Sequence, residues 1–447
     1  MIKSKVLAFS CFISLLLFVS CEQDDDQDFI KLETSDYESE VVLDWIALTL
    51  QLTEETEGFT PPVAARVYGY SGLALYESVR HGMPNYKSLE GQLTDFNTGT
   101  IPTPSLDLEY HWGAVANAAL SVFLENAFQT ATVENLALID ALNIQYTTQF
   151  RSETTADIVD RSVAYGELVG NAVLDFANTD GQEDCYLNNF PSSYEVPVGE
   201  GLWEPTSSDT PIPLQPYWGD VRPFMTENVA ETLPVAPPAY STATDSEFYL
   251  EAIEVYEAVQ NLTPEQQVIA EFWSDDPGNT ATPPGHSYSI MMQVLALENA
   301  DLARTAEVYA KLGMGIHDAF VSCWYAKYYY NLVRPITYIH EHIDDTWTIP
   351  LATPPFPEYT SGHSVQSGAT AKILTDLFGD NYEFTDSTHI NRTDIDGSPR
   401  HFDSFYDFAD EAAISRLYGG IHYRAAIEVG IDQGIQVGEN IATLQFK

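Results

Sequence analysis

Three short segments near the C-terminus combine residue types that suit a tetrahedral oxyanion. They read Lys327-x6-Arg334-Pro335, Ser361-Gly362-His363 and Arg416-x5-His422. Together they supply three fixed cations, two histidines, a hydroxyl and a glycine. The chain has only 19 Lys and Arg against 66 Asp and Glu, so three cations gathered in these segments indicate an anion site.

The seven-residue step from Lys327 to Arg334 equals two helical turns. We therefore expect both side chains on one face of a single helix. Pro335 would end that helix directly after the arginine. The planar guanidinium suits a phosphate-like ion, and the ammonium supplies a compact charge. A helix that simply ends in Arg-Pro, with a surface lysine, would explain the same residues.

Ser361-Gly362-His363 precedes an apolar, helix-like run from Val365 to Leu377. Serine is a good N-cap, and the free amides at a helix start bind anions. Glycine lets the backbone approach a ligand closely, and histidine can transfer a proton near neutral pH. An ordinary capped helix with an incidental histidine remains the alternative.

Arg416 and His422 flank Gly419-Gly420, which predicts a break in the helix that can aim both side chains inward. A buried Arg–Asp pair and a core histidine would account for this segment alone. The three segments support an anion site by occurring together, in this order and with these residue types.

The segments resemble the vanadium-dependent haloperoxidases and their relatives, the type 2 phosphatidic acid phosphatases and bacterial class A acid phosphatases. The family pattern is K-x6-RP, PSGH and SR-x5-H, and this chain reads KYYYNLVRP, TSGH and SRLYGGIH. Trp324 lies three residues before Lys327, as in the haloperoxidases. Phe356 stands where chloroperoxidases have phenylalanine. The stretch 271–286 is also similar to bacterial haloperoxidases, and the chain as a whole is similar to iodoperoxidases of marine flavobacteria.

The resemblance implies an all-α fold of two packed helix bundles with a long irregular excursion. It implies that vanadate oxygens are bound by Lys327, Arg334, Ser361, Gly362 and Arg416, and vanadium axially by His422. His363 would be the acid/base toward hydrogen peroxide, and Lys327 would polarise that peroxide. Halide, with iodide first and bromide next, would attack it and leave as hypohalous acid. Trp324, Phe356 and Asp276 would line the halide pocket or support the ligands.

Two positions depart from the family pattern. Thr360 replaces the proline of PSGH, and Tyr325 stands where bacterial relatives often have aspartate. The second change leaves the halide preference open. Asp276 is then the candidate partner of His363 or Lys327, although an aspartate before Pro-Gly is also typical of a turn.

The N-terminus predicts export. Residues 1–20 have the charged and apolar regions of a signal peptide, and the sequence FVSC ending at Cys21 is similar to a bacterial lipobox. We expect lipidation at Cys21, an acidic flexible leader over 21–38, and one helical domain over 39–447 with its catalytic part at 271–447. The protein would be an outer-membrane lipoprotein, surface-exposed or released, and a monomer. A formal charge of −47 argues against nucleic acid or an anionic membrane surface as partner.

Apolar spacing predicts helices along the rest of the chain, over residues 40–52, 63–79, 112–125, 133–150, 156–176, 246–260, 263–272, 286–298, 301–334 (as a pair), 364–378, 405–416 and 423–443. The Pro- and Trp-rich stretch 180–244 predicts an ordered excursion over the helices. We expect loops at 380–400 and at His340-x-His342, without calcium or zinc. Cys185 and Cys323 could pair, but we expect both free.

Two other functions remain open. An acid phosphatase would use the same cage, with His422 attacking phosphorus and His363 protonating the leaving group. A surface glycan-binding lipoprotein would use the 26 Tyr and 7 Trp to stack on sugars, but it would leave the cationic segments unexplained.

Overall fold

The computed structural model describes residues 31–208 and 211–447, and helices form most of the regular structure. Its first part contains η1 (Thr34–Asp36), α1 (Glu40–Glu55), α2 (Pro61–Val79), η2 (Arg80–Gly82), α3 (Trp112–Ala127), α4 (Val133–Glu153) and α5 (Ala156–Ala177). Short elements follow: η3 (Cys185–Leu187), η4 (Trp218–Asp220) and α6 (Glu227–Ala230).

The second part is also helical. It contains α7 (Glu247–Gln260), α8 (Pro264–Phe272), α9 (Thr282–Leu297), α10 (Leu302–Tyr330), α11 (Pro335–His342), α12 (Gly362–Phe378), α13 (Phe405–Tyr418) and α14 (Arg424–Ala442). The strands β1 (Phe384–Asp386) and β2 (Arg400–Phe402) pair antiparallel, with Phe384 opposite Phe402.

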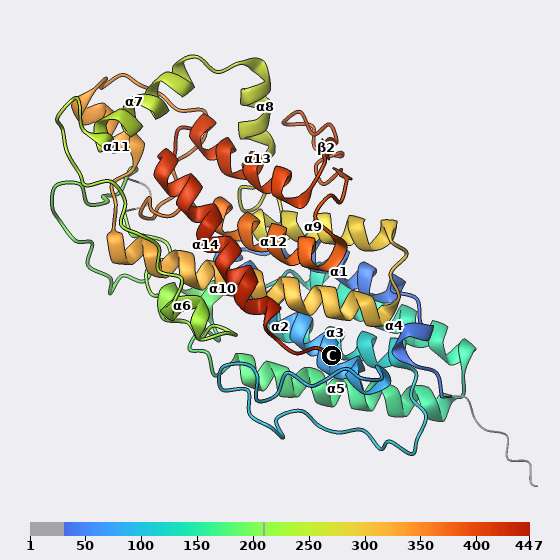
Figure 1. The fold of residues 1–447 in the computed structure, drawn as a ribbon. Helices are drawn as coiled ribbons and strands as arrows, with labels where there is room; N and C mark the ends of the chain where they lie inside the picture. Colours follow the sequence, from blue (N-terminus) through green and yellow to red (C-terminus); the bar gives the residue numbers. More distant parts are fainter. Residues whose placement is uncertain (1–30, 209–210) are drawn as a thin grey trace, which may run out of the picture. The chain divides into compact units, whose positions relative to one another are not determined.

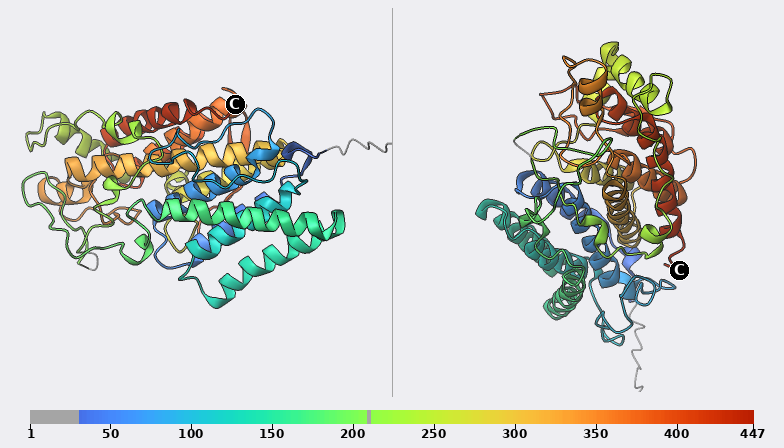
Figure 2. Two further views of the ribbon diagram at one scale, coloured as in Figure 1. Left: turned by 90° about the horizontal axis from the view of Figure 1, so that it is seen from below. Right: turned by 90° about the vertical axis from the view of Figure 1, so that its left-hand side faces the viewer.

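The long helix α10 joins two groups of helices. It packs against α2 on one side and against α12 and α14 on the other, and Figures 1 and 2 show it between these elements in each view. Helix α3 packs on α2 and α5, while α13 packs on α12. This arrangement confirms the predicted all-α fold of two packed bundles.

Glycines bring α12 and α14 almost into backbone contact. A Cβ on Gly434 would lie only 2.0 Å from the Val365 carbonyl oxygen, and one on Gly368 would lie 2.5 Å from that of Ile431. Neither position can therefore hold a larger residue without moving a helix. At the same interface the Ser361 amide donates to the Ala426 carbonyl over 3.0 Å, which holds the start of α12 beside the start of α14.

The stretch 180–244 is the predicted ordered excursion. Its described residues form only short helical turns, yet Trp203, Trp218 and Phe224 are almost fully buried. Its backbone is tied to the later part of the chain by the Trp203 amide on the Asn331 carbonyl (2.7 Å) and the Leu214 amide on the Pro355 carbonyl (2.8 Å). The excursion therefore covers the loops that carry the predicted site.

One prediction about the site segments was wrong: Lys327 and Arg334 do not share a helix. Helix α10 ends at Tyr330, and Asn331 follows in a left-handed conformation with φ 48°. Asparagine tolerates this conformation better than most residues. Arg334 is the N-cap of the next helix, α11, and Pro335 is its first residue rather than the end of the previous one.

Two predicted loops contain regular structure. His340 and His342 lie in the last turn of α11, where His340 Nε2 donates to the Trp347 carbonyl over 2.7 Å. The 380–400 region contains β1 and ends at β2, because Phe384 and Phe402 pair across the strands and bury their rings. Cys185 and Cys323 are both free and buried.

The folded unit begins at Leu32, before the expected boundary at residue 39. Thr34 is fully buried, and the Tyr37 carbonyl accepts from the Leu302 amide over 2.9 Å. The predicted signal peptide and Cys21 lie outside the described residues. Within the described part, no helix has both the length and the apolar character needed to cross a bilayer.

Candidate oxyanion-binding site

The structure brings the three predicted segments together. Lys327 comes from the last turn of α10, Arg334 from the start of α11, His363 from the start of α12, and Arg416 from the last turn of α13. His422 lies in the turn before α14. Burial, and then the charges of Arg334, Lys327 and Arg416, lower the pKa of His422 well below its ordinary value. These side chains therefore belong to one site, in which the cations act on His422.

Arg334 is fully buried and leaves part of its guanidinium free. Its Nε donates to the Phe356 carbonyl over 2.9 Å, and its Nη1 donates to the Ile421 carbonyl over 2.8 Å. Its Nη2 is buried and has no hydrogen-bond partner. Burial lowers the pKa of Arg334 to about 10, so the side chain stays charged near neutral pH with an unused donor.

His422 has its tautomer set by two neighbours. Its Nε2 lies 3.3 Å from Arg334 Nη1, and because a guanidinium only donates, Nε2 must accept. Nδ1 therefore carries the hydrogen and donates to Glu358 Oε1 over 2.8 Å. The lone pair of Nε2 thus faces the cations, which is the orientation that a metal or phosphorus ligand needs.

Glu358 is a site residue that the sequence analysis missed. It is fully buried, and its Oε1 also accepts from the Tyr423 amide over 2.9 Å. Burial raises the pKa of Glu358 to about 8, although Arg334 and Lys327 oppose the shift. An isolated carboxylate in the aromatic segment before Ser361 was the available signal.

The contacts of Lys327 differ from those expected of a residue that binds vanadate oxygens. Its Nζ donates to the backbone carbonyls of Pro357 (3.1 Å), Glu358 (3.0 Å) and Thr360 (2.5 Å). These three carbonyls use all three ammonium hydrogens. Burial lowers the pKa of Lys327 to about 7. The lysine therefore fixes the loop before α12, and it can reach a ligand only by giving up one of these bonds.

Arg416 and His363 share a neighbour, the backbone of Trp273. Arg416 Nη1 donates to the Trp273 carbonyl over 2.6 Å, and His363 also makes a hydrogen bond with this backbone. Arg416 Nε and His363 Nε2 are buried without partners. Burial, and then the charge of Arg416, lower the pKa of His363 well below its ordinary value, so its imidazole is neutral and can accept a proton.

The start of α12 adds backbone donors. Ser361 is the N-cap, and its side chain accepts from the Ser364 amide over 3.3 Å. The first amides of a helix have no intrahelical partner and can bind an anion. A Cβ on Gly362 would meet only the Trp324 ring, at an ordinary 3.7 Å. The protein itself therefore does not require glycine here, and the open space suits a ligand.

The charges of the site call for an anion. Lys327, Arg334 and Arg416 are at most 3 % exposed. The buried Glu358 favours the charged forms of Lys327 and Arg334, while Arg416 is influenced by Asp276 and by the buried Asp275, which is itself paired with His286. Burying uncompensated cations is costly unless a counter-ion joins them. Among the described residues, three buried nitrogens of this site lack partners: Arg334 Nη2, Arg416 Nε and His363 Nε2. A tetrahedral oxyanion would satisfy both the charge and the free donors.

Comparison with known proteins supports the same conclusion, a site for an oxyanion. Residues 307–446 match the family model of the VCPO second helical-bundle domain. The curated vanadium chloroperoxidase of Curvularia inaequalis is 21 % identical over 490 residues, covering 88 % of this chain and 80 % of that protein. A solved bacterial vanadium-dependent iodoperoxidase is 36 % identical, with a TM-score of 0.81, and the match covers 91 % of this chain and 96 % of that one. This chain belongs to the vanadium-dependent haloperoxidase family.

A more distant structure agrees in fold. The holo-type bacterial vanadium-dependent chloroperoxidase is 15 % identical, with a TM-score of 0.64, and covers 86 % of this chain and 92 % of that chain. At this identity the likeness concerns the fold alone. The two proteins therefore share the helical fold.

Trp324 and Phe356 form an aromatic wall beside the cations. Their ring centroids are 5.0 Å apart. Lys327 Nζ lies 4.9 Å from the Phe356 ring centre, and the Arg334 guanidinium carbon also lies 4.9 Å from it. These contacts hold the two cations against apolar surface and keep water from that side.

The structure does not place Asp276 where the sequence suggested. Asp276 is exposed, and its carbonyl accepts from the Asn279 and Thr280 amides in a turn. Within the described residues, no hydrogen bond joins its carboxylate to His363 or Lys327. Its link to the site is electrostatic, because its charge favours the charged form of Arg416. The Pro-Gly that follows Asp276 explains the turn.

Proposed function

We propose that this haloperoxidase-family chain binds vanadate and uses hydrogen peroxide to oxidise halide to hypohalous acid, with iodide as the first substrate and bromide next. The observation that carries the proposal is the buried accepting Nε2 of His422 inside a cage of cations with free donors. Vanadate is a tetrahedral anion, so its oxygens suit the free donors and its charge suits the cations of this cage. The relatives named above support the assignment.

Each group of the cage has a distinct task in this proposal. Arg334 Nη2, Arg416 Nε and the amides of Ser361-Gly362 would hold the oxygens, and His422 Nε2 would bind vanadium. Lys327 would join them by exchanging one carbonyl partner. Bound vanadate would supply a Lewis acid that activates peroxide without changing its own oxidation state.

His363 would move the proton. Its Nε2 is free, and its lowered pKa keeps the ring neutral at working pH, so it can take a proton from incoming hydrogen peroxide. The neighbouring charge of Arg416 disfavours the resulting imidazolium, which therefore returns the proton readily to the departing oxygen. The Trp273 backbone keeps the ring in place for both steps.

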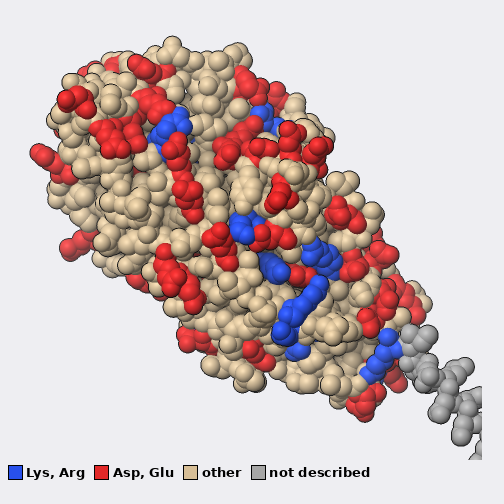
Figure 3. All heavy atoms as spheres, viewed as in Figure 1, with Lys and Arg blue, Asp and Glu red and all other residues tan. Residues whose placement is uncertain are grey.

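The preference for iodide has two supports. Iodide is the halide that is most easily oxidised, so it needs the least from the site, and the 36 % identical relative is an iodoperoxidase. The acidic surface does not exclude halide. Figure 3 shows acidic side chains spread over the visible face with few basic ones, but at physiological or higher salt such charges are screened beyond about 8 Å. The buried cations then dominate near the site.

The decisive experiment supplies purified protein with orthovanadate, hydrogen peroxide and iodide, and follows triiodide formation. Activity that needs vanadate, with bromide turnover measured beside it, is the expected result. A fully loaded protein without vanadate-dependent halide oxidation would refute the proposal. Replacing His422 with alanine should abolish vanadate binding.

Acid phosphatase activity is the second candidate, because the Nε2 lone pair of His422 could equally attack phosphorus. The same cage would bind phosphate. Trp324 and Phe356 favour the peroxidase, since they present apolar surface where a phosphate ester would need room. Rapid hydrolysis of a nitrophenyl phosphate, without halide oxidation, would reverse the order of the two functions.

We also propose that the protein is exported as a monomer and lipidated at Cys21, with its catalytic part at 271–447. The support is the signal-like N-terminus and the position of all the cage residues in that part. Labelling with a fatty-acid analogue in the native host should mark wild-type protein but not the Cys21→Ser variant. Equal labelling of both would refute lipidation, and sedimentation would give the oligomeric state.

A further inference from the structure

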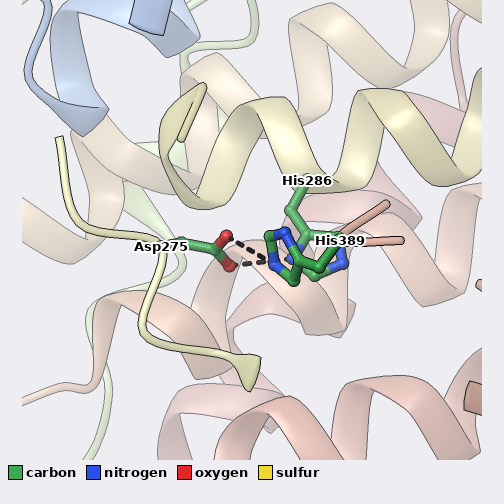
Figure 4. Close-up of side chains that lie close together, drawn as sticks. All are labelled: Asp275, His286 and His389. Atoms are coloured by element: carbon green, nitrogen blue, oxygen red, sulfur yellow. Dashed lines mark hydrogen bonds and ion pairs between the residues drawn. The ribbon is translucent and has the colours of Figure 1, made fainter. Parts of the chain in front are cut away.

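A second cluster of ligand-type side chains lies outside the oxyanion cage. Asp275 comes from the loop after α8, His286 from α9, and His389 from the loop after β1. Figure 4 shows the three side chains pointing toward one another. Each is at most 3 % exposed, and one ligand atom from each lies within 4.8 Å of the others.

The contact between Asp275 and His389 is not an ordinary hydrogen bond. Asp275 Oδ1 and His389 Nε2 lie 3.3 Å apart, but both atoms are buried and neither has a properly aligned hydrogen-bond partner. Two ligands on a tetrahedral ion, each bonded at about 2.0–2.1 Å, lie roughly 3.3–3.4 Å apart. The separation therefore fits two atoms that share a cation.

His286 is already oriented as a metal ligand. Its Nε2 lies 2.7 Å from Asp386 Oδ2, and its Nδ1 lies 2.9 Å from Asp275 Oδ2. Asp386 is itself fully buried and accepts from the Thr388 amide and hydroxyl. A carboxylate on the far nitrogen of a ligating histidine fixes its ring orientation. Nδ1 donates to Asp275 here, so an ion that binds beside Asp275 would displace the proton from Nδ1 and take its place.

The cluster also has access to solvent. It borders a cleft of about 320 Å³ that Asn279, Ser289 and Thr388 help to line. An ion could enter through this cleft, and a water molecule could occupy the fourth position of a tetrahedron. Nothing in the oxyanion cage requires this opening, because the cleft is lined by other residues.

We propose that Asp275, His286 and His389 bind one divalent ion of the zinc class. Two imidazoles and one carboxylate suit Zn²⁺, whereas calcium and magnesium prefer all-oxygen sites. The ion would also steady the chain next to the cage, because Asp275 is two residues from Trp273, whose carbonyl holds Arg416. The site itself stands independently of the proposed halide oxidation.

The test uses the full-length protein after dialysis against a chelator. Isothermal titration with Zn²⁺ should give one site per chain, and Co²⁺ should give the visible absorption of a tetrahedral complex. The His389→Gln variant should lose both signals, and Asp386→Asn should weaken zinc binding by about 10–100-fold. The matched control His401→Gln changes an exposed histidine that pairs with Asp403, and it should bind zinc like wild type.

His422→Ala excludes the oxyanion cage as the source of the signal, since it should keep the zinc site. The proposal is overturned if wild type binds no stoichiometric zinc, if His389→Gln binds it as tightly as wild type, or if His422→Ala removes the binding. The cobalt spectrum of wild type decides the matter even if a variant fails to fold.

Discussion

The Nη1 of Arg334 donates to Nε2 of His422 over 3.3 Å, so a permanent cation marks the position that the imidazole lone pair faces. Glu358 completes the arrangement by accepting from Nδ1 on the other side of the ring. The histidine is thereby held neutral, with one tautomer and one orientation, before any ligand arrives. This preorganisation reduces the cost of binding a central atom to Nε2.

Glu358→Gln should weaken vanadate binding by about 10–100-fold, because an amide can present its NH₂ group to Nδ1 and destabilise the required tautomer. Calorimetric titration of the apo protein with orthovanadate would measure the change. Glu254→Gln is the control, since Glu254 pairs with Arg424 in a partly exposed ion pair and should leave the affinity unchanged. Equal affinities of the two variants would contradict the role of Glu358.

Lys327→Met should lower the free energy of unfolding by about 3 kcal/mol or more in vanadate-free protein. The reason is that three buried carbonyls lose their donor, and each unsatisfied buried group costs about 1–3 kcal/mol. Urea unfolding would show the loss. Lys311→Met removes only an i,i+4 pair with Glu307 and should cost less than about 1 kcal/mol. Matching losses would mean that Lys327 does not hold the loop.

The free energy of unfolding should decrease at acid pH because His317 is buried. Burial lowers the pKa of His317 to about 4, so the folded state excludes a proton that the unfolded chain binds below about pH 6.5. This contribution is complete above pH 6.5 and is lost as the pH falls toward 4, a change of about 3 kcal/mol at most. Unfolding curves between pH 4 and 8 should show a smaller acid loss in His317→Phe, which keeps a ring between Tyr70 and Phe224. Parallel curves would disprove the assignment.

The sequence predicted the fold and the site unequally well, for physical reasons. Helix periodicity and caps gave most helices, as at Thr263, where the capping box is present. The relation of Lys327 to Arg334 was wrong because periodicity cannot detect a single left-handed residue such as Asn331. Glu358 was missed because its role depends on a contact with His422, 64 residues away, which no local pattern encodes.

The same limit applies to Asp275 and Asp276. The two neighbouring aspartates look alike in the sequence, yet one is buried between histidines and the other is exposed in a turn. Only the path of the backbone through this loop decides which of the two aspartates is buried. Charge composition, by contrast, was a sound guide, because scarce cations were found together in one buried place.

Gly362→Ala should separate ligand binding from folding. The added Cβ would meet only the Trp324 ring at 3.7 Å, and alanine suits a helix better than glycine by about 0.5–1 kcal/mol, so the unfolding free energy should stay equal or rise slightly. The methyl group would fill the space beside the first amides of α12, so vanadate affinity should fall by about tenfold or more.

Thermal unfolding and vanadate titration on the same sample would test both halves of this prediction. Gly368→Ala provides the opposite control, because its Cβ would lie 2.5 Å from the Ile431 carbonyl oxygen and should destabilise the α12–α14 contact. If Gly362→Ala bound vanadate as tightly as wild type, the open space at the start of α12 would not belong to the oxyanion. If it unfolded as easily as Gly368→Ala, glycine would be needed there for packing instead.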